Sequence, residues 1–253
     1  MVQSIGFSKY LPVGSPEVAV EFLNTWGVDE IVVLEIERGL DLALVGRLAE
    51  KSMVPLTIGG GITSVGQMRE LIHGGADKIS INRAALNTPE IISEAASIFG
   101  NQCVVVSIDV RAGEEEQAAL RAKEVQRLGA GEILLRRVER DGAGQGYDTA
   151  LIERVSKEVS IPVIAAGGCG SPRHIQDAFA AGADAASVGN TLHFSEHSVI
   201  TIKQQLAQAG TPVRLDTHTT YEGFGFDERG RLQKKDDAYL EKLRFEYHPP
   251  EII

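Results

Sequence analysis

Short apolar runs alternate with longer amphipathic stretches over most of this chain. The apolar runs are rich in Val and Ile and have the length of strands buried in a parallel sheet. They cover residues 31–36, 55–58, 77–82, 103–109, 133–135, 162–166 and 184–188. Stretches with helical punctuation, such as an initial proline or a final glycine, cover residues 16–26, 43–51, 65–73, 89–99, 114–128, 150–159 and 172–181. This alternation predicts an α/β fold in which crossover helices join parallel strands.

Two parts of the chain repeat one another. Residues 54–82 align without a gap onto residues 161–189, and both end in Gly-Ala-Asp followed by a strand. Such a repeat is typical of a TIM-type (β/α)8 barrel assembled from two half-barrels. We count seven barrel strands by this pattern, whereas closure requires about eight. The first strand is therefore expected to be missing, because residues 1–15 are too short and too rich in Gly, Pro and Ser to supply it.

The pattern changes after Gly210, where the chain becomes polar and turn-rich. Residues 212–215 are a short strand candidate. We expect a barrel domain over residues 1–215 and a C-terminal extension over residues 216–253, packed on or beside the barrel. In an alternative arrangement, residues 243–247 fill the place of the missing strand.

Composition narrows the class of protein. With 253 residues, 43% of them hydrophobic, the chain suits one large core better than two. The formal net charge of −10 argues against nucleic acid or an anionic membrane as the main partner. Cys103 and Cys169 have no metal-site or disulfide spacing, and we find no membrane-spanning run or secretory signal. We expect a cytoplasmic protein with no cofactor and no metal.

Two aspartates follow predicted strands. Asp109 ends one strand, and Asp141 opens the glycine-rich turn after residues 133–135. Because the carboxyl ends of parallel strands meet at one mouth of a barrel, both are candidates for general acid and base chemistry on one substrate. Two simpler interpretations stay open. Asp109 could be a structural aspartate bound by backbone amides, and Asp141-Gly142 could be a surface turn.

Glycine-rich loops recur at matching places in the repeat. Such loops, leading into helix N-termini, offer backbone amides and a favourable dipole to phosphate. Two matching sites would suit a substrate with a phosphate at each end. The candidate phosphate-binding residues are Gly60, Gly61 and Asn82 in the first half, and Gly167, Gly168, Gly189 and Asn190 in the second.

Charged residues begin three of the predicted strands, at the opposite mouth. They are Glu30, Lys78 and Glu132. From the sequence pattern alone, a solvated rim of charges is the simplest interpretation.

Several segments together resemble a known family. GADKISIN, FGNQCVVVSID, GAGEILL, RDG and GYD are similar to the cyclase subunit (HisF type) of imidazole glycerol phosphate synthase, the ammonia-using barrel of histidine biosynthesis. The resemblance covers residues 2 to about 215. Gly-Tyr-Asp at residues 146–148 distinguishes it from the sister isomerase of the same pathway.

The resemblance implies an ammonia-dependent lyase or cyclase. In that family a glutaminase partner supplies ammonia through the barrel, and the substrate is a doubly phosphorylated aminoimidazole ribonucleotide. Asp109 matches one of two catalytic aspartates, and Asp141 matches the substrate-binding aspartate of the RDG loop. Gly142 joins Gly61, Asn82, Gly168, Gly189 and Asn190 at phosphate-site positions. Glu30, Lys78 and Glu132 match three of the four charges of the ammonia gate.

The sequence also departs from the family pattern. The other catalytic aspartate and the gate arginine belong to the missing first strand, and the family's substrate-contacting lysine falls at Gln3. A Thr-Ser pair is replaced by Arg136-Arg137. We therefore also consider a divergent paralogue in the amidino modification of bacterial surface sugars, or a catalytically impaired scaffold for a glutamine amidotransferase.

Overall fold

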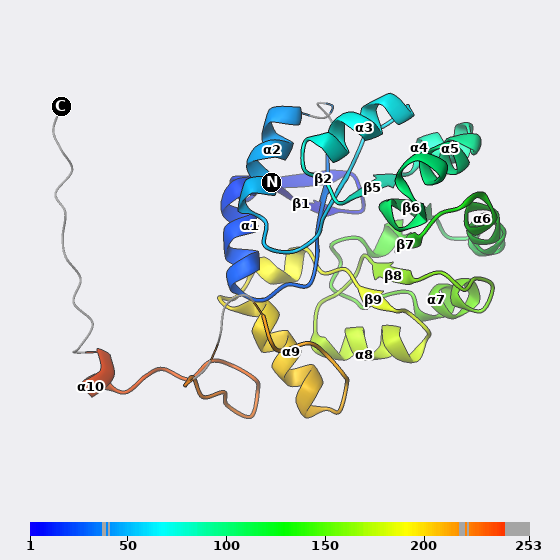
Figure 1. Cartoon of the computed structure of the whole chain (residues 1–253). Coiled ribbons are helices and arrows are strands. Elements are labelled where there is room, and N and C mark those ends of the chain that lie inside the picture. The colour runs from blue at the N-terminus through cyan, green and yellow to red at the C-terminus, as the bar shows by residue number, and fades with distance from the viewer. Residues whose placement is uncertain (37–38, 40, 218–220, 222, 241–253) are drawn as a thin grey trace, which may run out of the picture.

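One parallel sheet organises the fold. The computed structural model describes residues 1–36, 39, 41–217, 221 and 223–240. Seven parallel strands pair in chain order: β3 (Ile31–Leu34), β4 (Leu56–Gly59), β5 (Lys78–Ile81), β6 (Val104–Val110), β7 (Glu132–Arg137), β8 (Val163–Ala166) and β9 (Ala185–Ala186). The sheet curls, and the helices form an arc around its outer face (Figure 1). The predicted α/β fold with parallel strands is confirmed.

The seven predicted helices are present, whereas the helices at residues 83–87 and 198–208 were not predicted. Together they are α1 (Pro16–Thr25), α2 (Leu42–Lys51), α3 (Val65–His73), α4 (Arg83–Asn87), α5 (Glu90–Phe99), α6 (Glu115–Leu128), α7 (Thr149–Ser156), α8 (Pro172–Ala180) and α9 (Ser198–Gln208). The side chains of Ser15, Asp41, Ser64 and Asp148 accept hydrogen bonds from backbone amides in the first turns of α1, α2, α3 and α7. These caps satisfy N–H groups that have no partner inside a helix, so they fix where the helices begin.

The two faces of the sheet differ in chemistry. Alternate strand residues such as Ile58, Ile79 and Ile133 belong to the main core between the sheet and the helices. Val105, Leu134 and Ala166 form a separate, smaller cluster on the inner face. Because side chains alternate along a strand, the buried hydroxyls of Thr57, Ser80 and Ser107 share this inner face. The inside of the curl is therefore partly polar.

The internal repeat has matching hydrogen bonds. The Leu56 amide donates to Asp77 Oδ2 over 2.8 Å, and the Val163 amide donates to Asp184 Oδ2 over the same distance. The Asp77 amide returns a bond to the Leu56 carbonyl, and the Asp184 amide returns one to Val163, each over 2.9 Å. The two aspartates of the Gly-Ala-Asp segments thus fasten consecutive strands in the same way.

Residues 1–15 do not add a strand to the parallel sheet. They form an antiparallel hairpin, β1 (Val2–Ile5) and β2 (Lys9–Pro12), which lies inside the arc of helices (Figure 1). Gly6 and Phe7 turn the hairpin with φ angles of 56° and 57°. Within the described part of the chain, β3 and β9 each pair with one neighbour, so the predicted count of seven strands is confirmed.

The predicted strand at residues 212–215 is wrong. No neighbouring strand among the described residues offers this segment a ladder, and side chains hold it instead. Arg214 Nε donates to Asp29 Oδ1 over 2.9 Å, and Lys203 Nζ of α9 donates to the same carboxylate over 2.8 Å. Residues 243–247, the alternative filler of the missing strand, lie outside the described residues.

Part of the C-terminal segment contacts the helices. Tyr221 Oη donates to the Thr25 carbonyl at the end of α1 over 3.1 Å, and it lies 3.1 Å from His197 Nδ1. The described part of the segment ends in α10 (Asp237–Leu240), which lies apart from the arc of helices (Figure 1). Among the residues described, no helix has the length and apolar character needed to cross a membrane.

Candidate active site

Asp109 lies at the carboxyl edge of the sheet, where the strands end. It pairs in register with Arg136 of β7. Asn82, which directly follows β5, donates from Nδ2 to Asp109 Oδ2 over 2.6 Å. Arg136 Nε lies 3.8 Å from Asp109 Oδ1, which makes an ion pair but is too long for a hydrogen bond. Asp109 Oδ1 is buried and has no hydrogen-bond partner among the described residues.

The surroundings of Asp109 shift its proton affinity. Burial raises the pKa of the Asp109 carboxyl above its ordinary value. The Arg136 guanidinium and the Asn82 hydrogen bond act against this increase, while the Asp141 charge adds to it. A carboxyl with a raised pKa can exchange a proton closer to neutral pH, as a general acid or base requires. Among the described residues, the hydrogen bond to the Asp109 carboxylate comes from the Asn82 side chain and not from a backbone amide.

Asp141 is held by the hairpin. Ser4 Oγ donates to Asp141 Oδ2 over 2.5 Å, and the Gly6 amide donates to the Asp141 carbonyl over 3.0 Å. Asn190 Nδ2 donates to the Ser4 carbonyl over 2.7 Å. A Cβ atom added at Gly142 would overlap that same carbonyl oxygen. Three predicted site residues, Asp141, Gly142 and Asn190, are therefore brought together beneath the β1–β2 hairpin.

The predicted phosphate-binding glycines differ in their surroundings. A Cβ at Gly60 would overlap the Glu35 carbonyl, and one at Gly168 would overlap the Gly146 carbonyl. These two glycines therefore let their loops pack against the loop after the preceding strand. A Cβ at Gly61 or Gly189 would meet no atom within 4 Å, so both face open space. A Cβ at Gly167 would lie 3.1 Å from Arg136 Cγ.

The three charges at the opposite, amino edge of the sheet form one ion cluster. Lys78 Nζ lies 2.8 Å from Glu30 Oε2 and 2.7 Å from Glu132 Oε1, and Thr57 Oγ1 donates to Glu30 over 2.5 Å. The Lys78 side chain is only 18% exposed. Burial lowers the pKa of Lys78, but hydrogen bonds to Glu132 and Glu30 outweigh it, and the net pKa is raised. The interpretation as a solvated rim is wrong, because strand register brings Glu30 and Glu132 into contact with Lys78 on the inner face.

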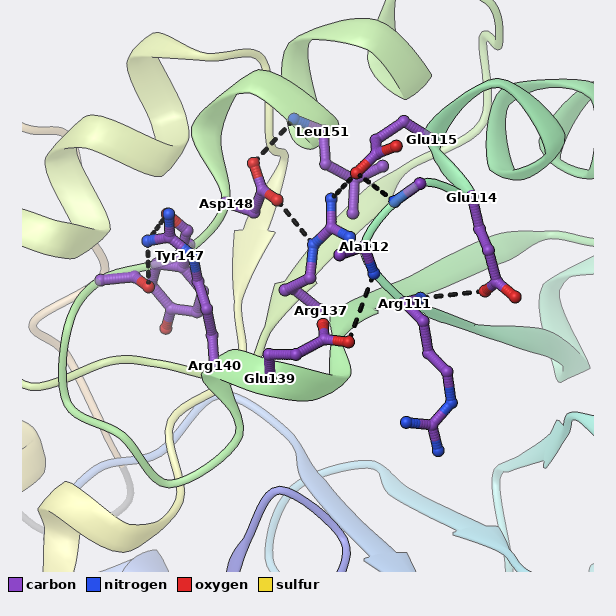
Figure 2. Close-up of polar contacts among 12 residues, drawn as sticks. Arg111, Ala112, Glu114, Glu115, Arg137, Glu139, Arg140, Tyr147, Asp148 and Leu151 are labelled. Atoms are coloured by element: carbon purple, nitrogen blue, oxygen red, sulfur yellow. Dashed lines mark hydrogen bonds and ion pairs between the residues drawn. The ribbon is translucent and has the colours of Figure 1, made fainter.

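A second ion cluster, which the sequence pattern did not suggest, lies on the outer face of β7. Arg137 donates from Nε to Asp148 Oδ2 over 2.7 Å and from Nη2 to Glu115 Oε1 over 2.6 Å (Figure 2). Asp148 also accepts from the Leu151 amide over 3.1 Å as the cap of α7. Arg137 thus joins the N-termini of α6 and α7, and its side chain is only 8% exposed.

The Gly-Tyr-Asp segment fixes the loop that carries Asp141. Arg140 Nη1 donates to the carbonyls of Gly146 and Tyr147 over 3.0 and 3.1 Å (Figure 2). Tyr147 is buried, and its hydroxyl donates to the Ser187 carbonyl just past β9 over 2.9 Å. Hydrogen bonds therefore connect the two ends of this loop and also anchor it to the segment just past β9, two strands along the sheet from β7.

Comparison with known proteins identifies the family. A model of the family described as histidine biosynthesis protein matches residues 1–198. The chain belongs to that family. Its relatives include a Vibrio vulnificus (strain YJ016) protein provisionally named imidazole glycerol phosphate synthase subunit hisF2, which is 40% identical over 251 residues, 91% of this chain and 92% of the relative.

Further members of the histidine biosynthesis protein family give the same result. The imidazole glycerol phosphate synthase subunit HisF of Methanocaldococcus jannaschii is 38% identical over 255 residues, 85% of this chain and 94% of the relative. The HisF subunit of Thermococcus onnurineus is 41% identical over 235 residues, which cover 85% of this chain and 93% of the relative. The resemblance to HisF-type subunits is confirmed. Since the identity to hisF2 is close to the identities to HisF, these values do not single out a divergent paralogue.

Proposed function

We propose that this HisF-type chain is the lyase/cyclase subunit of an imidazole glycerol phosphate synthase in histidine biosynthesis, with Asp109 as its acid–base group. One observation supports this most strongly. Asp109 lies at the same edge as both glycine-rich loops, with one carboxylate oxygen bound by Asn82 and the other left without a hydrogen bond. A carboxyl that is oriented through one oxygen and has no hydrogen bond at the other can accept or donate a proton at a bound substrate.

Substrate binding is assigned to the loops around Asp109. We assign the two phosphates of an aminoimidazole ribonucleotide to the two glycine-rich loops, and the ribose hydroxyls to Asp141. A Cβ at Gly61 or Gly189 would meet no atom within 4 Å, so a phosphate has room to approach the backbone at these two glycines. Gly60, Gly167 and Gly168 shape the loops, and Asn82, Gly142 and Asn190 complete the set.

The finer description of the fold is part of this proposal. A TIM-type (β/α)8 barrel of two half-barrels is supported by the matching bonds of Asp77 and Asp184 and by the curl of the sheet. We assign the barrel to residues 1–215 and a separate C-terminal extension to residues 216–253.

Ammonia would reach Asp109 from the amino edge. The cluster of Glu30, Lys78 and Glu132 is proposed as the gate that receives it from a class I glutaminase subunit. The inner face offers the buried hydroxyl of Thr57 at this cluster and those of Ser80 and Ser107 between the cluster and Asp109. Small polar groups of this kind can pass a hydrogen-bonding molecule along a path that bulk water does not fill.

The proposal is tested with the purified chain, ammonium and the doubly phosphorylated aminoimidazole substrate. Asp109→Asn keeps an oxygen for the Asn82 bond but removes the titrating group, so turnover should fall by about 10²-fold or more. The matched control is Asp177→Asn on α8, whose carboxylate pairs with Arg173 at the surface. Turnover unaffected by Asp109→Asn would exclude Asp109 as the acid–base group.

The gate is tested with a glutaminase partner. Lys78→Met should leave turnover with free ammonium within about twofold while it lowers glutamine-dependent turnover, because only the latter needs a sealed path. Equal losses with both nitrogen sources would instead mean that Lys78 supports the fold.

A second candidate function is a scaffold for a glutamine amidotransferase. It is favoured by the hydrogen bond from Ser4 to Asp141, since the hairpin occupies the carboxylate that substrate would need. Tight glutaminase binding without turnover by the wild-type chain would support the scaffold over the enzyme.

A further inference from the structure

Two neighbouring arginines end β7, and they point to opposite faces of the sheet. Arg137 is on the outer face, where it contacts Glu115 and Asp148. Arg136 is on the inner face, in register with Asp109 on one side and Ala166 on the other. Successive strand residues always alternate in this way, so the Arg136-Arg137 pair can serve two unrelated purposes.

The Arg136 side chain is fixed by packing. Its guanidinium carbon lies 5.0 Å from the centre of the Phe7 ring, a cation–π distance. Its Cγ lies so close to Gly167 that a Cβ there would be only 3.1 Å away. With 16% of its surface exposed, Arg136 is held between the turn of the β1–β2 hairpin and the glycine loop after β8.

Arg136 is the foremost positive charge acting on Asp109. The charged groups around the Asp109 carboxyl are Arg136 on β7, Arg111 just past β6 and Asp141 in the loop after β7. The two arginines favour the ionised carboxylate, and Asp141 and burial oppose it. Among these charges, Arg136 has the largest effect, in keeping with its ion pair to Oδ1 at 3.8 Å.

We propose that Arg136 is a positioning residue of the Asp109 site. Held by Phe7 and by the space that Gly167 leaves, its guanidinium keeps the Asp109 carboxylate ionised and turned toward it. The catalytic part of this inference rests on the proposed function of Asp109. The electrostatic part does not, because the ion pair exists whether or not the chain turns over.

The experiment follows the titration of Asp109 by carboxyl carbon NMR in wild type, Arg136→Met and Arg136→Lys. Met keeps the aliphatic stem that packs on Gly167 but removes the charge, so the midpoint should rise. An opposite charge within about 4–6 Å commonly lowers a carboxyl pKa by roughly 1–3 units, and the expected rise is of that order. Arg136→Lys restores a positive charge, so the Asp109 midpoint in this variant should return most of the way to the wild-type value. Arg173→Gln, which removes a surface charge on α8, is the matched control and should leave the midpoint unchanged.

Activity adds a second readout. In Arg136→Met the acidic limb of the kcat/KM profile against pH should move upward together with the NMR midpoint, which loss of packing alone would not produce. An unchanged midpoint in a folded Arg136→Met protein overturns the inference. If Arg136→Met does not fold, the Asp109 midpoint is measured in Arg136→Gln and Phe7→Leu instead, and the same criterion applies. A wild-type chain without turnover refutes the proposed function, while the NMR midpoints still decide the role of Arg136.

Discussion

Removing Arg137 should destabilise the fold measurably without touching the Asp109 site. Arg137→Met replaces a guanidinium that is 8% exposed with an apolar side chain of similar length. The change leaves the Asp148 carboxylate, 16% exposed, without its ion-pair partner. It also removes a link to α6, whose Glu115 loses the hydrogen bond that holds its pKa near 2.

The magnitude follows from how much of this cluster is closed to water. Breaking a fully buried ion pair costs about 3–5 kcal/mol. Here one partner, Glu115, is 36% exposed and can be hydrated again. We therefore expect Arg137→Met to lower the free energy of unfolding by about 2 kcal/mol, equivalent to a fall in Tm of roughly 4–8 °C for a domain of this size.

Urea denaturation at neutral pH measures the change, with a double-mutant cycle to assign it. Asp148→Asn keeps an oxygen for the Leu151 amide, so it isolates the charge from the helix cap. Adding Asp148→Asn to Arg137→Met should recover part of the lost stability, because the unpaired carboxylate is then gone. A free energy of unfolding within about 0.5 kcal/mol of wild type for Arg137→Met would refute the reasoning.

Two further predictions concern the site itself. Gly142→Ala should make the β1–β2 hairpin sensitive to proteases, because a Cβ at residue 142 would overlap the Ser4 carbonyl. Gly144→Ala is the control, because Gly144 has a similar φ (66°, against 69° for Gly142) but free space for a Cβ. Equal protease sensitivity of the hairpin in both variants would contradict this explanation. Asp109→Asn should make the protein more stable at neutral pH in urea titrations, since burial raises the folded pKa of Asp109. The wild type then loses stability as the pH rises from the unfolded pKa through the folded one, and the asparagine variant does not. If the free energies of unfolding of the two proteins change in parallel between pH 4 and 8, the predicted direction of the pH dependence is wrong.

The sheet could be predicted because its signals are local. Runs of Val and Ile mark strands wherever they occur, and glycine or proline marks the helix ends. The ends of weak strands were less certain, as the two residues of β9 show against a prediction of 184–188. The hairpin was not predicted, since residues 1–15 carry no alternation of apolar and polar positions. What holds it is Asp141 and Asn190, which are far away in the sequence.

For the candidate site, strand direction predicted at which edge of the sheet each residue lies, but not its detailed surroundings. Parallel strands place Asp109 at one edge and Lys78 at the other, whatever the details. The different surroundings of Gly60 and Gly61 depend on which loop lies next to each, and the glycine pattern does not contain that information. Arg136 could have been found, because it has the opposite parity to the core residues Ile133 and Leu135 and so had to face inward.

The unequal ends of the sheet affect how two molecules can meet. An unpaired strand is a template on which a second chain can extend the ladder. At one end this chain offers β9, only two residues long, so a visiting strand would gain few backbone bonds. At the other end of the described sheet, β3 has four residues, and Lys203 and Arg214 bind the Asp29 carboxylate just before the strand begins. The shortness of both end strands thus limits edge-to-edge growth into fibres.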